Sequence, residues 1–166
     1  IRELQASLPV MAETNTLIPL KVHGVLVDPN TDTQIVVLRD EQNSEVLPIW
    51  VGTAEGTSTR LALENVIPPR PMSHDLICSF ASHLGFTLDR VVITEVKNNT
   101  YFSTLFLSKD GLEKSVDSRP SDAIALAVRC QCPIYVTPEV LERRGGEDLD
   151  TWLSKLDQKG SEQPEA

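Results

Sequence analysis

Three short polar clusters stand out in this sequence, each where a predicted strand or loop runs into a predicted helix. They are WVGTAEG (50–56), PRPMSHD (69–75) and DSRPSD (117–122). Their charged and titratable residues are Glu55, Arg70, His74, Asp75, Asp117, Arg119 and Asp122. Carboxylates can hold a divalent metal, arginine suits phosphate oxygens, and histidine moves protons near neutral pH. These residue types fit a metal-assisted phosphodiesterase.

Helix capping is the simpler explanation for part of the third cluster. Asp122 in a first helical turn complements the helix dipole, and Ser121 can accept hydrogen bonds from free N–H groups. Capping does not explain Arg119, because a cation at a helix N-terminus opposes the dipole. Two interpretations therefore stay open: a ligand-binding site, or a structural network of arginines and carboxylates. The sequence has no standard nuclease or metal-ligand spacing to decide between them.

The elements that must position these clusters follow from hydrophobic periodicity and turn residues. Predicted strands span residues 17–28, 33–40, 45–51, 87–96, 101–108, 112–118 and 133–136, and predicted helices span 53–65, 73–84 and 120–129. Most connections between strands are too short for helical crossovers, so the pairing should be antiparallel. Each half of the chain reads as three strands followed by a helix. The sequence therefore predicts an α+β fold with a duplicated β-β-β-α unit and largely antiparallel sheets packed with helices.

The predicted domain organisation has four parts. Residues 1–16 form an N-terminal extension, 17–137 a single domain, 138–158 a C-terminal helical tail, and 159–166 a disordered end. The tail carries an apolar stripe of Leu149, Trp152, Leu153 and Leu156. This stripe either docks on its own domain or contacts a partner, and the second reading would make the chain a self-associating scaffold.

Composition restricts the classes of function. The net charge of −9 argues against broad electrostatic capture of nucleic acid. No apolar run approaches the roughly 20 residues that span a bilayer, so no membrane partner is expected.

Three cysteines without a disulfide-framework spacing, Cys78, Cys130 and Cys132, predict a reduced cytoplasmic protein in which they pack as small apolar residues. Because the chain starts at Ile1, prior removal of a signal peptide stays open.

The three clusters resemble the signature blocks of the bifunctional nuclease domain family. The matching segments are LPIWVGTAEG (47–56), PPRPMSHDLI (68–77) and DSRPSDAIALAVRCQCPIYV (117–136), within a resemblance that spans about residues 19–137. It implies an α+β fold with a duplicated strand–helix unit. It also implies nuclease activity, which some members, notably in plants, direct at both RNA and DNA. Gly56 replaces the alanine usual in the family, which weakens the predicted helix by about 1 kcal/mol.

The polar positions of the family match Glu55, Arg70, His74, Asp75, Arg119, Ser121 and Asp122, and the chemistry of each residue indicates its role in a nuclease. The phosphate-binding residues would be Arg70, Arg119 and Ser121, and the catalytic residues would be His74, Asp75, Asp122 and Glu55. His74 would act as general acid or base. The carboxylates of Glu55, Asp75 and Asp122 would be the ligands if Mg²⁺ or Mn²⁺ takes part; no other cofactor is implied.

Two functions from different classes follow. The first is hydrolysis of phosphodiester bonds, with RNA or DNA as partner and a homo-oligomer as a further expectation. The alternative is a non-catalytic module that binds an anionic ligand or a protein partner. In that case the arginines and carboxylates form a structural network.

Overall fold

A computed structural model describes residues 17–28, 31, 33–42 and 44–144, and the predicted elements follow one another there in order. The strands are β1 (Ile18–Val27), β2 (Gln34–Arg39), β3 (Val46–Val51), β4 (Thr87–Lys97), β5 (Thr100–Lys109), β6 (Leu112–Ser118) and β7 (Ile134–Val136). The helices are α1 (Thr53–Leu63), α2 (Ser73–His83), α3 (Pro120–Cys130) and α4 (Pro138–Arg143). The predicted N-terminal extension, most of the tail with its apolar stripe, and the disordered end lie outside the described residues.

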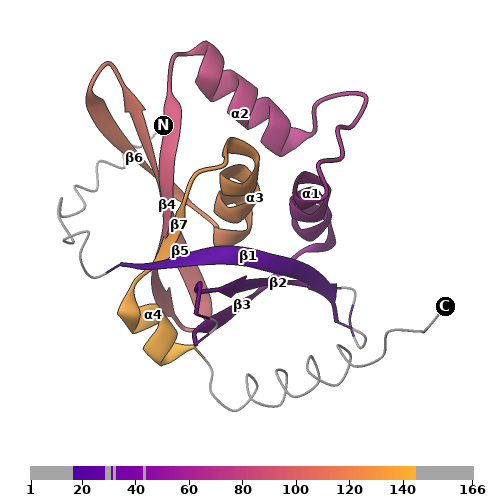
Figure 1. The fold of residues 1–166 in the computed structure, drawn as a ribbon, viewed down its shortest axis with the longest axis vertical. Helices are drawn as coiled ribbons and strands as arrows, with labels where there is room; N and C mark the ends of the chain where they lie inside the picture. The colour runs from indigo at the N-terminus through magenta and orange to yellow at the C-terminus, as the bar shows by residue number, and fades with distance from the viewer. Residues whose placement is uncertain (1–16, 29–30, 32, 43, 145–166) are drawn as a thin grey trace.

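The strands form one seven-stranded sheet in the order β3-β2-β1-β7-β4-β5-β6. Every neighbouring pair is antiparallel except β4 and β7, which are parallel. The α+β class and the largely antiparallel pairing are therefore confirmed. The succession β-β-β-α occurs in both halves, but an origin of the halves by duplication stays a prediction. Figure 1 shows β1 to β3 running across the view, while β4, β5 and β7 run down it.

Three helices lie on one side of this sheet, in the angle between its two halves (Figure 1). Helix α3 packs against α1, α2 and both halves of the sheet. Its inward face consists of small and aliphatic residues, which bring it close to the strands. The fold thus gathers α1, α2 and α3 side by side, and these are the helices that follow the three polar clusters of the sequence.

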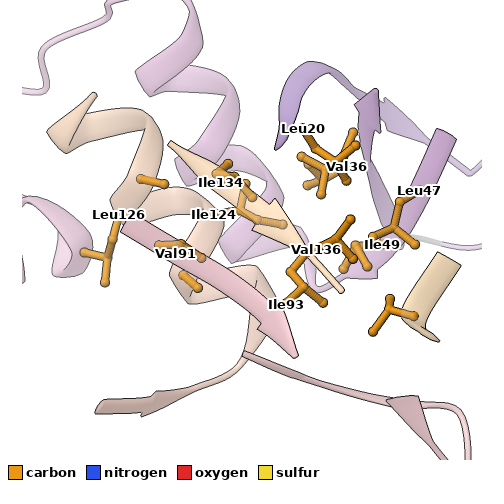
Figure 2. Packing of buried hydrophobic residues seen from close by; sticks show 14 of the residues in the cluster. Leu20, Val36, Leu47, Ile49, Val91, Ile93, Ile124, Leu126, Ile134 and Val136 are labelled. Carbon is orange, nitrogen blue, oxygen red and sulfur yellow. The ribbon is translucent and has the colours of Figure 1, made fainter. Parts of the chain in front are cut away.

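The main core fixes the position of α3. Figure 2 shows Ile124 of this helix near Val91 and Ile134 of the central strands, and Leu126 and Val136 belong to the same core cluster. These five side chains are almost fully buried. Burying an aliphatic side chain of this size stabilises the fold by about 1.5–3 kcal/mol. The polar residues at the two ends of α3 are therefore held in place by its apolar middle.

Two tight hairpins define the second half of the sheet. At the β4–β5 turn Asn98 and Asn99 have φ of 50° and 58°, and at the β5–β6 turn Asp110 and Gly111 have φ of 52° and 77°. Positive φ at both central residues is the geometry of the turns that match the right-handed twist of paired strands. Asparagine, aspartate and glycine tolerate this conformation best, so these residues set the register of β4, β5 and β6.

Gly56 has a packing role in α1. It is buried, and a Cβ at this position would lie 2.3 Å from Oε1 and 2.7 Å from Cβ of Gln34 in β2. The absence of a side chain therefore lets α1 approach the sheet. The helix forms across Gly56 despite the intrinsic cost of glycine, because tertiary packing overrides propensity.

Helix α2 presents an apolar face to solvent. Leu76, Ile77, Phe80 and Leu84 are all exposed, Phe80 to 66%. The homo-oligomer expected from the sequence would cover such a face, and it stays a prediction. Among the residues that the structure describes, no helix has the length and apolar character needed to cross a membrane.

Candidate active site between three helices

His74 lies at the centre of a polar network that joins α1, α2 and α3. Its side chain is nearly buried, with the residue 7% exposed. Nε2 lies 3.0 Å from Oδ1 of Asp122 in α3, and Nδ1 lies 2.8 Å from Oγ of Ser58 in α1. Both ring nitrogens are therefore engaged by protein groups.

The solvent-facing end of this network is built around Arg119. Its Nε donates to Oδ2 of Asp122 at 2.7 Å, and its Nη2 donates to Oδ1 of Asp122 at 3.1 Å. The same Nη2 donates to Oε1 of Glu55 in α1 at 2.9 Å. The Arg119 side chain is nevertheless 67% exposed. Its Nη1 has no acceptor among the described residues, so one edge of the guanidinium faces solvent.

The interior end is built around Arg129. Its Nε donates to Oδ1 of Asp75 at 2.6 Å, and its Nη1 donates to the carbonyl of Ala125 at 3.0 Å. Its Nη2 donates to the carbonyl and to Oγ of Ser58, at 3.1 and 2.9 Å. The side chain is only 10% exposed. Every nitrogen of this guanidinium has a partner inside the protein.

We call the complete set of seven side chains the interhelical network: Glu55, Ser58, His74, Asp75, Arg119, Asp122 and Arg129. Helical spacing places its members on shared faces. Glu55 and Ser58 lie three residues apart on α1, and residues at that spacing are neighbours on a helix surface. Arg119 immediately precedes Pro120, the first residue of α3, so that the Arg119–Asp122 pair spans the first turn. At the start of α2, Asp75 accepts the backbone N–H of Met72 at 2.8 Å.

The charges of the network shift the pKa values of its carboxyl groups. The hydrogen bond from Arg129 lowers the pKa of Asp75, against a smaller opposing effect of burial. For Asp122, burial acts to raise the pKa, but hydrogen bonds from Arg119 and His74 and the attraction of their charges act together against it, and the net shift is downward. The same contacts, first with Asp122 and then with Glu55, raise the pKa of Arg119. Both aspartates are therefore anionic at neutral pH.

Five of the seven site residues expected from the sequence come together in the interhelical network: Glu55, His74, Asp75, Arg119 and Asp122. Two do not. Arg70 is exposed in the loop between α1 and α2, and within the described chain it has no hydrogen bond or ion pair. Ser121 is half-buried in the first turn of α3, with no side-chain hydrogen bond in the same part of the chain.

Sequence reasoning missed Ser58 and Arg129 as members of the network. Ser58 follows Glu55 by one helical turn, and Arg129 follows Asp122 by two. These spacings were the available signal, because they put each pair on one helix face.

Ser58, His74 and Asp122 superficially resemble a serine–histidine–carboxylate triad. A nucleophilic serine must reach substrate, but Ser58 is only 2% exposed. Its hydroxyl oxygen also accepts a hydrogen bond from Arg129. The distances place Ser58 Oγ as a donor to Nδ1 of His74 when Nε2–H of the imidazole donates to Asp122. Ser58 thus orients the imidazole and is no nucleophile.

The three carboxylates expected as metal ligands do not share one site. Glu55 and Asp122 bind Arg119, whereas Asp75 binds Arg129 on the interior side of His74. Within the described ranges, no group of three or more histidine, cysteine, aspartate or glutamate side chains has a geometry that could hold a metal ion. As arranged here, these residues do not fit a bound Mg²⁺ or Mn²⁺.

The chain belongs to the bifunctional nuclease domain family, whose model matches residues 36–148. It is 34% identical over 126 residues to an uncharacterized protein of Mycobacterium tuberculosis, covering 76% of this chain and 75% of that protein. It is 35% identical over 114 residues to bifunctional nuclease 1 of Oryza sativa subsp. indica, covering 66% of this chain and 34% of the rice protein. Bifunctional nuclease 1 of Arabidopsis thaliana is 34% identical over 116 residues, or 68% of this chain and 36% of the plant protein. The chain thus spans about a third of these plant relatives.

Proposed function

We propose that this chain hydrolyses phosphodiester bonds of RNA or DNA at the solvent-facing end of the interhelical network. The observation that carries the proposal is Arg119, which two carboxylates hold in place while one edge of its guanidinium faces solvent. Arginine binds phosphate through paired N–H groups, and the N-terminus of α3 adds a positive field at the same place. The plant relatives named bifunctional nucleases support this choice of substrate class.

Glu55 is our candidate for the general base. Arg119 binds its Oε1, while Gly52 leaves space beside Oε2: a Cβ at Gly52 would lie 2.5 Å from that oxygen. In the proposed reaction a phosphate oxygen binds Nη1 of Arg119, and a water molecule loses its proton to Glu55 as it attacks phosphorus. The leaving oxygen takes a proton from solvent. No step is assigned to a metal ion.

His74 and Asp122 have positioning roles in this proposal. Both oxygens of Asp122 are occupied by Arg119 and His74, so Asp122 fixes the guanidinium plane. His74 fixes Asp122 and is itself held by Ser58. A nearly buried imidazole with both nitrogens engaged is poorly placed to meet a polymeric substrate, so the acid–base role expected for it passes to Glu55.

The direct test is hydrolysis of labelled single-stranded RNA and DNA by protein free of host nucleases. The assay compares the unsubstituted chain with Glu55→Gln and Asp117→Asn, each with Mg²⁺, Mn²⁺ or EDTA. Asp117 is the matched control because it is an exposed carboxylate of the same polar segment, outside the network. We expect Glu55→Gln to lose about 10²-fold or more of the rate, as for a general base, and Asp117→Asn to keep it. Equal hydrolysis by all three proteins would rule out Glu55 as the base and point to contamination.

The second candidate is a non-catalytic binding module for an anionic ligand. It is favoured by one observation: the charged side chains of the network all have partners within it. A structural ion-pair network would look the same. A phosphorothioate oligonucleotide, which resists hydrolysis, separates the candidates when combined with the cleavage assay. A rise in melting temperature that depends on Arg119, without cleavage of the natural oligonucleotide, would establish the binding module.

A further inference from the structure

Two cysteines that are far apart in the sequence meet between α2 and α3. Sγ of Cys78 lies 3.2 Å from Sγ of Cys130, and the two residues are separated by 52 positions. Cys130 is exposed and Cys78 half-buried. The sequence predicts that these cysteines pack as small apolar residues, and the fold brings two of them into contact.

We propose that Cys78 and Cys130 form a reversible disulfide site that a hydroperoxide oxidises. A disulfide needs sulfur atoms about 2.05 Å apart, so the two sulfurs must approach by roughly 1 Å. Rotation about the side-chain bonds, with a small shift of α2 against α3, can supply that distance. The inference is independent of the nuclease proposal, because neither sulfur atom contacts the solvent-facing end of the network.

Cys130 is the thiol that reacts first. It is the more exposed of the two, and the hydrogen bond from Cys78 lowers its pKa, with a further contribution from the adjacent Arg129. The shared hydrogen bond and burial raise the pKa of Cys78, which therefore keeps its proton. A thiolate is the nucleophilic form of cysteine, so Cys130 attacks and Cys78 resolves.

The chemistry balances with a hydroperoxide as the only oxidant. The Cys130 thiol first gives its proton to solvent, and the thiolate attacks the peroxide oxygen. The O–O bond breaks, Cys130 becomes a sulfenic acid, and the leaving oxygen takes up a proton from solvent and departs as water or an alcohol. Cys78 then attacks the Cys130 sulfur and loses its proton. The S–O bond breaks, water leaves, and the disulfide forms. Together the two thiols lose two electrons, which reduce the peroxide.

Cys132 is a bystander in this scheme. It is half-buried and packs against the main core, and burial raises its pKa to about 11. Gln131 has φ of 55°, and this left-handed residue ends α3 and directs the chain away from the helix before Cys132. The structure therefore separates one unreactive cysteine from a reactive pair.

The bond would tie α2 to α3 beside the interior half of the network. Cys78 follows His74 by four residues and Asp75 by three, so all three lie on neighbouring positions of one face of α2. Cys130 directly follows Arg129. A disulfide would hold the two helices together next to the Asp75–Arg129 ion pair.

The test treats the full, reduced chain with hydrogen peroxide, alkylates the remaining thiols with iodoacetamide, and maps the peptides by mass spectrometry. We expect a monomeric product lighter by two hydrogen atoms, a Cys78–Cys130 cross-link, an alkylated Cys132, and reversal by dithiothreitol. The oxidised chain should also melt several degrees above the reduced chain, because the bond closes a long loop.

Two variants supply the controls. Cys132→Ser should form the same bond, whereas Cys78→Ser should stop at a Cys130 sulfenic acid that dimedone traps. The proposal is wrong if peroxide leaves both Cys78 and Cys130 open to alkylation. It is equally wrong if Cys132 or a second chain supplies one of the bonded sulfurs.

Discussion

The two arginines at the ends of α3 have the same chemistry and opposite surroundings. Arg129 directs every nitrogen into the protein, to Asp75, Ser58 and Ala125, and is almost buried. Arg119 binds Asp122 and Glu55, yet most of its side chain faces solvent. The difference shows that membership of a charged network does not define a role. Of the two, only Arg119 has a guanidinium nitrogen, Nη1, without an acceptor in the described part of the chain.

The largest expected effect is on stability, at the interior end. Arg129→Met removes one partner from a largely buried ion pair, so that Oδ1 of Asp75 and the Ser58 carbonyl lose the hydrogen bonds from Arg129. We expect the free energy of unfolding to fall by about 3–5 kcal/mol. Urea denaturation followed by circular dichroism measures it. A loss no greater than that of Arg119→Met would mean that the two ends of α3 are equivalent, which contradicts the comparison.

The next effect is on activity, at the solvent-facing end. Arg119→Met should lower the rate of oligonucleotide hydrolysis by about 10²-fold, as when one donor to a developing charge is lost. The free energy of unfolding should change by no more than about 1 kcal/mol, because exposed ion pairs contribute little. Arg143→Met is the matched control, since Arg143 is also exposed and ion-paired, to Glu139 on α4. If Arg143→Met reduces hydrolysis as much, the loss reflects net charge and not a site.

A smaller loss of unfolding free energy is expected at Ser58, which contacts both His74 and Arg129. Ser58→Ala removes the hydroxyl that accepts from Arg129 and contacts Nδ1 of His74. Leaving buried polar groups without a partner costs about 1–3 kcal/mol, which urea denaturation would detect. Ser121→Ala removes a hydroxyl without a side-chain hydrogen bond in the described chain, and should stay within about 0.5 kcal/mol. Equal effects of the two substitutions would show that Ser58 does not support His74.

The smallest expected effect is on the pH dependence of stability, and it is measured by urea denaturation at a series of acidic pH values. The pKa of Asp75 lies lower in the folded than in the unfolded chain, so the unfolded chain binds more protons as the pH falls below the ordinary Asp value of 3.8. The stability contributed by Asp75 is complete above that value, and it disappears as the pH falls through the folded pKa. Asp75→Asn should therefore flatten the fall of the urea midpoint between neutral and strongly acidic pH. An unchanged acid slope in this variant would mean that Arg129 does not hold the carboxylate.

Much of the fold could be predicted from local patterns. Alternating apolar residues marked the strands, and Asn98-Asn99 and Asp110-Gly111 marked the hairpins, because these signals act within a few residues. The parallel pairing of β7 with β4 was not predicted. It depends on how distant segments meet, and a three-residue strand carries too little pattern to specify its neighbours.

Part of the interhelical network could also be predicted, because some of its contacts join residues that are close in the sequence. The Arg119–Asp122 pair lies within one helical turn, so its spacing was visible in the sequence. The preference of Asp75 for Arg129 was not, because it depends on how α2 and α3 pack. Spacing alone also could not show that His74 is nearly buried. Because of that burial we propose Glu55, and not His74, as the general base.

The short strand β7 has a consequence for how the chain folds. It lies between β1 and β4 in the sheet, yet it comes almost last in the described sequence. The two halves can each form hairpins early, but their union requires pairing between residues 18–20 and 134–136 across most of the chain. Contacts of such long range close slowly. During synthesis the two halves should therefore remain separate, with their edges open, until residues 134–136 have left the ribosome.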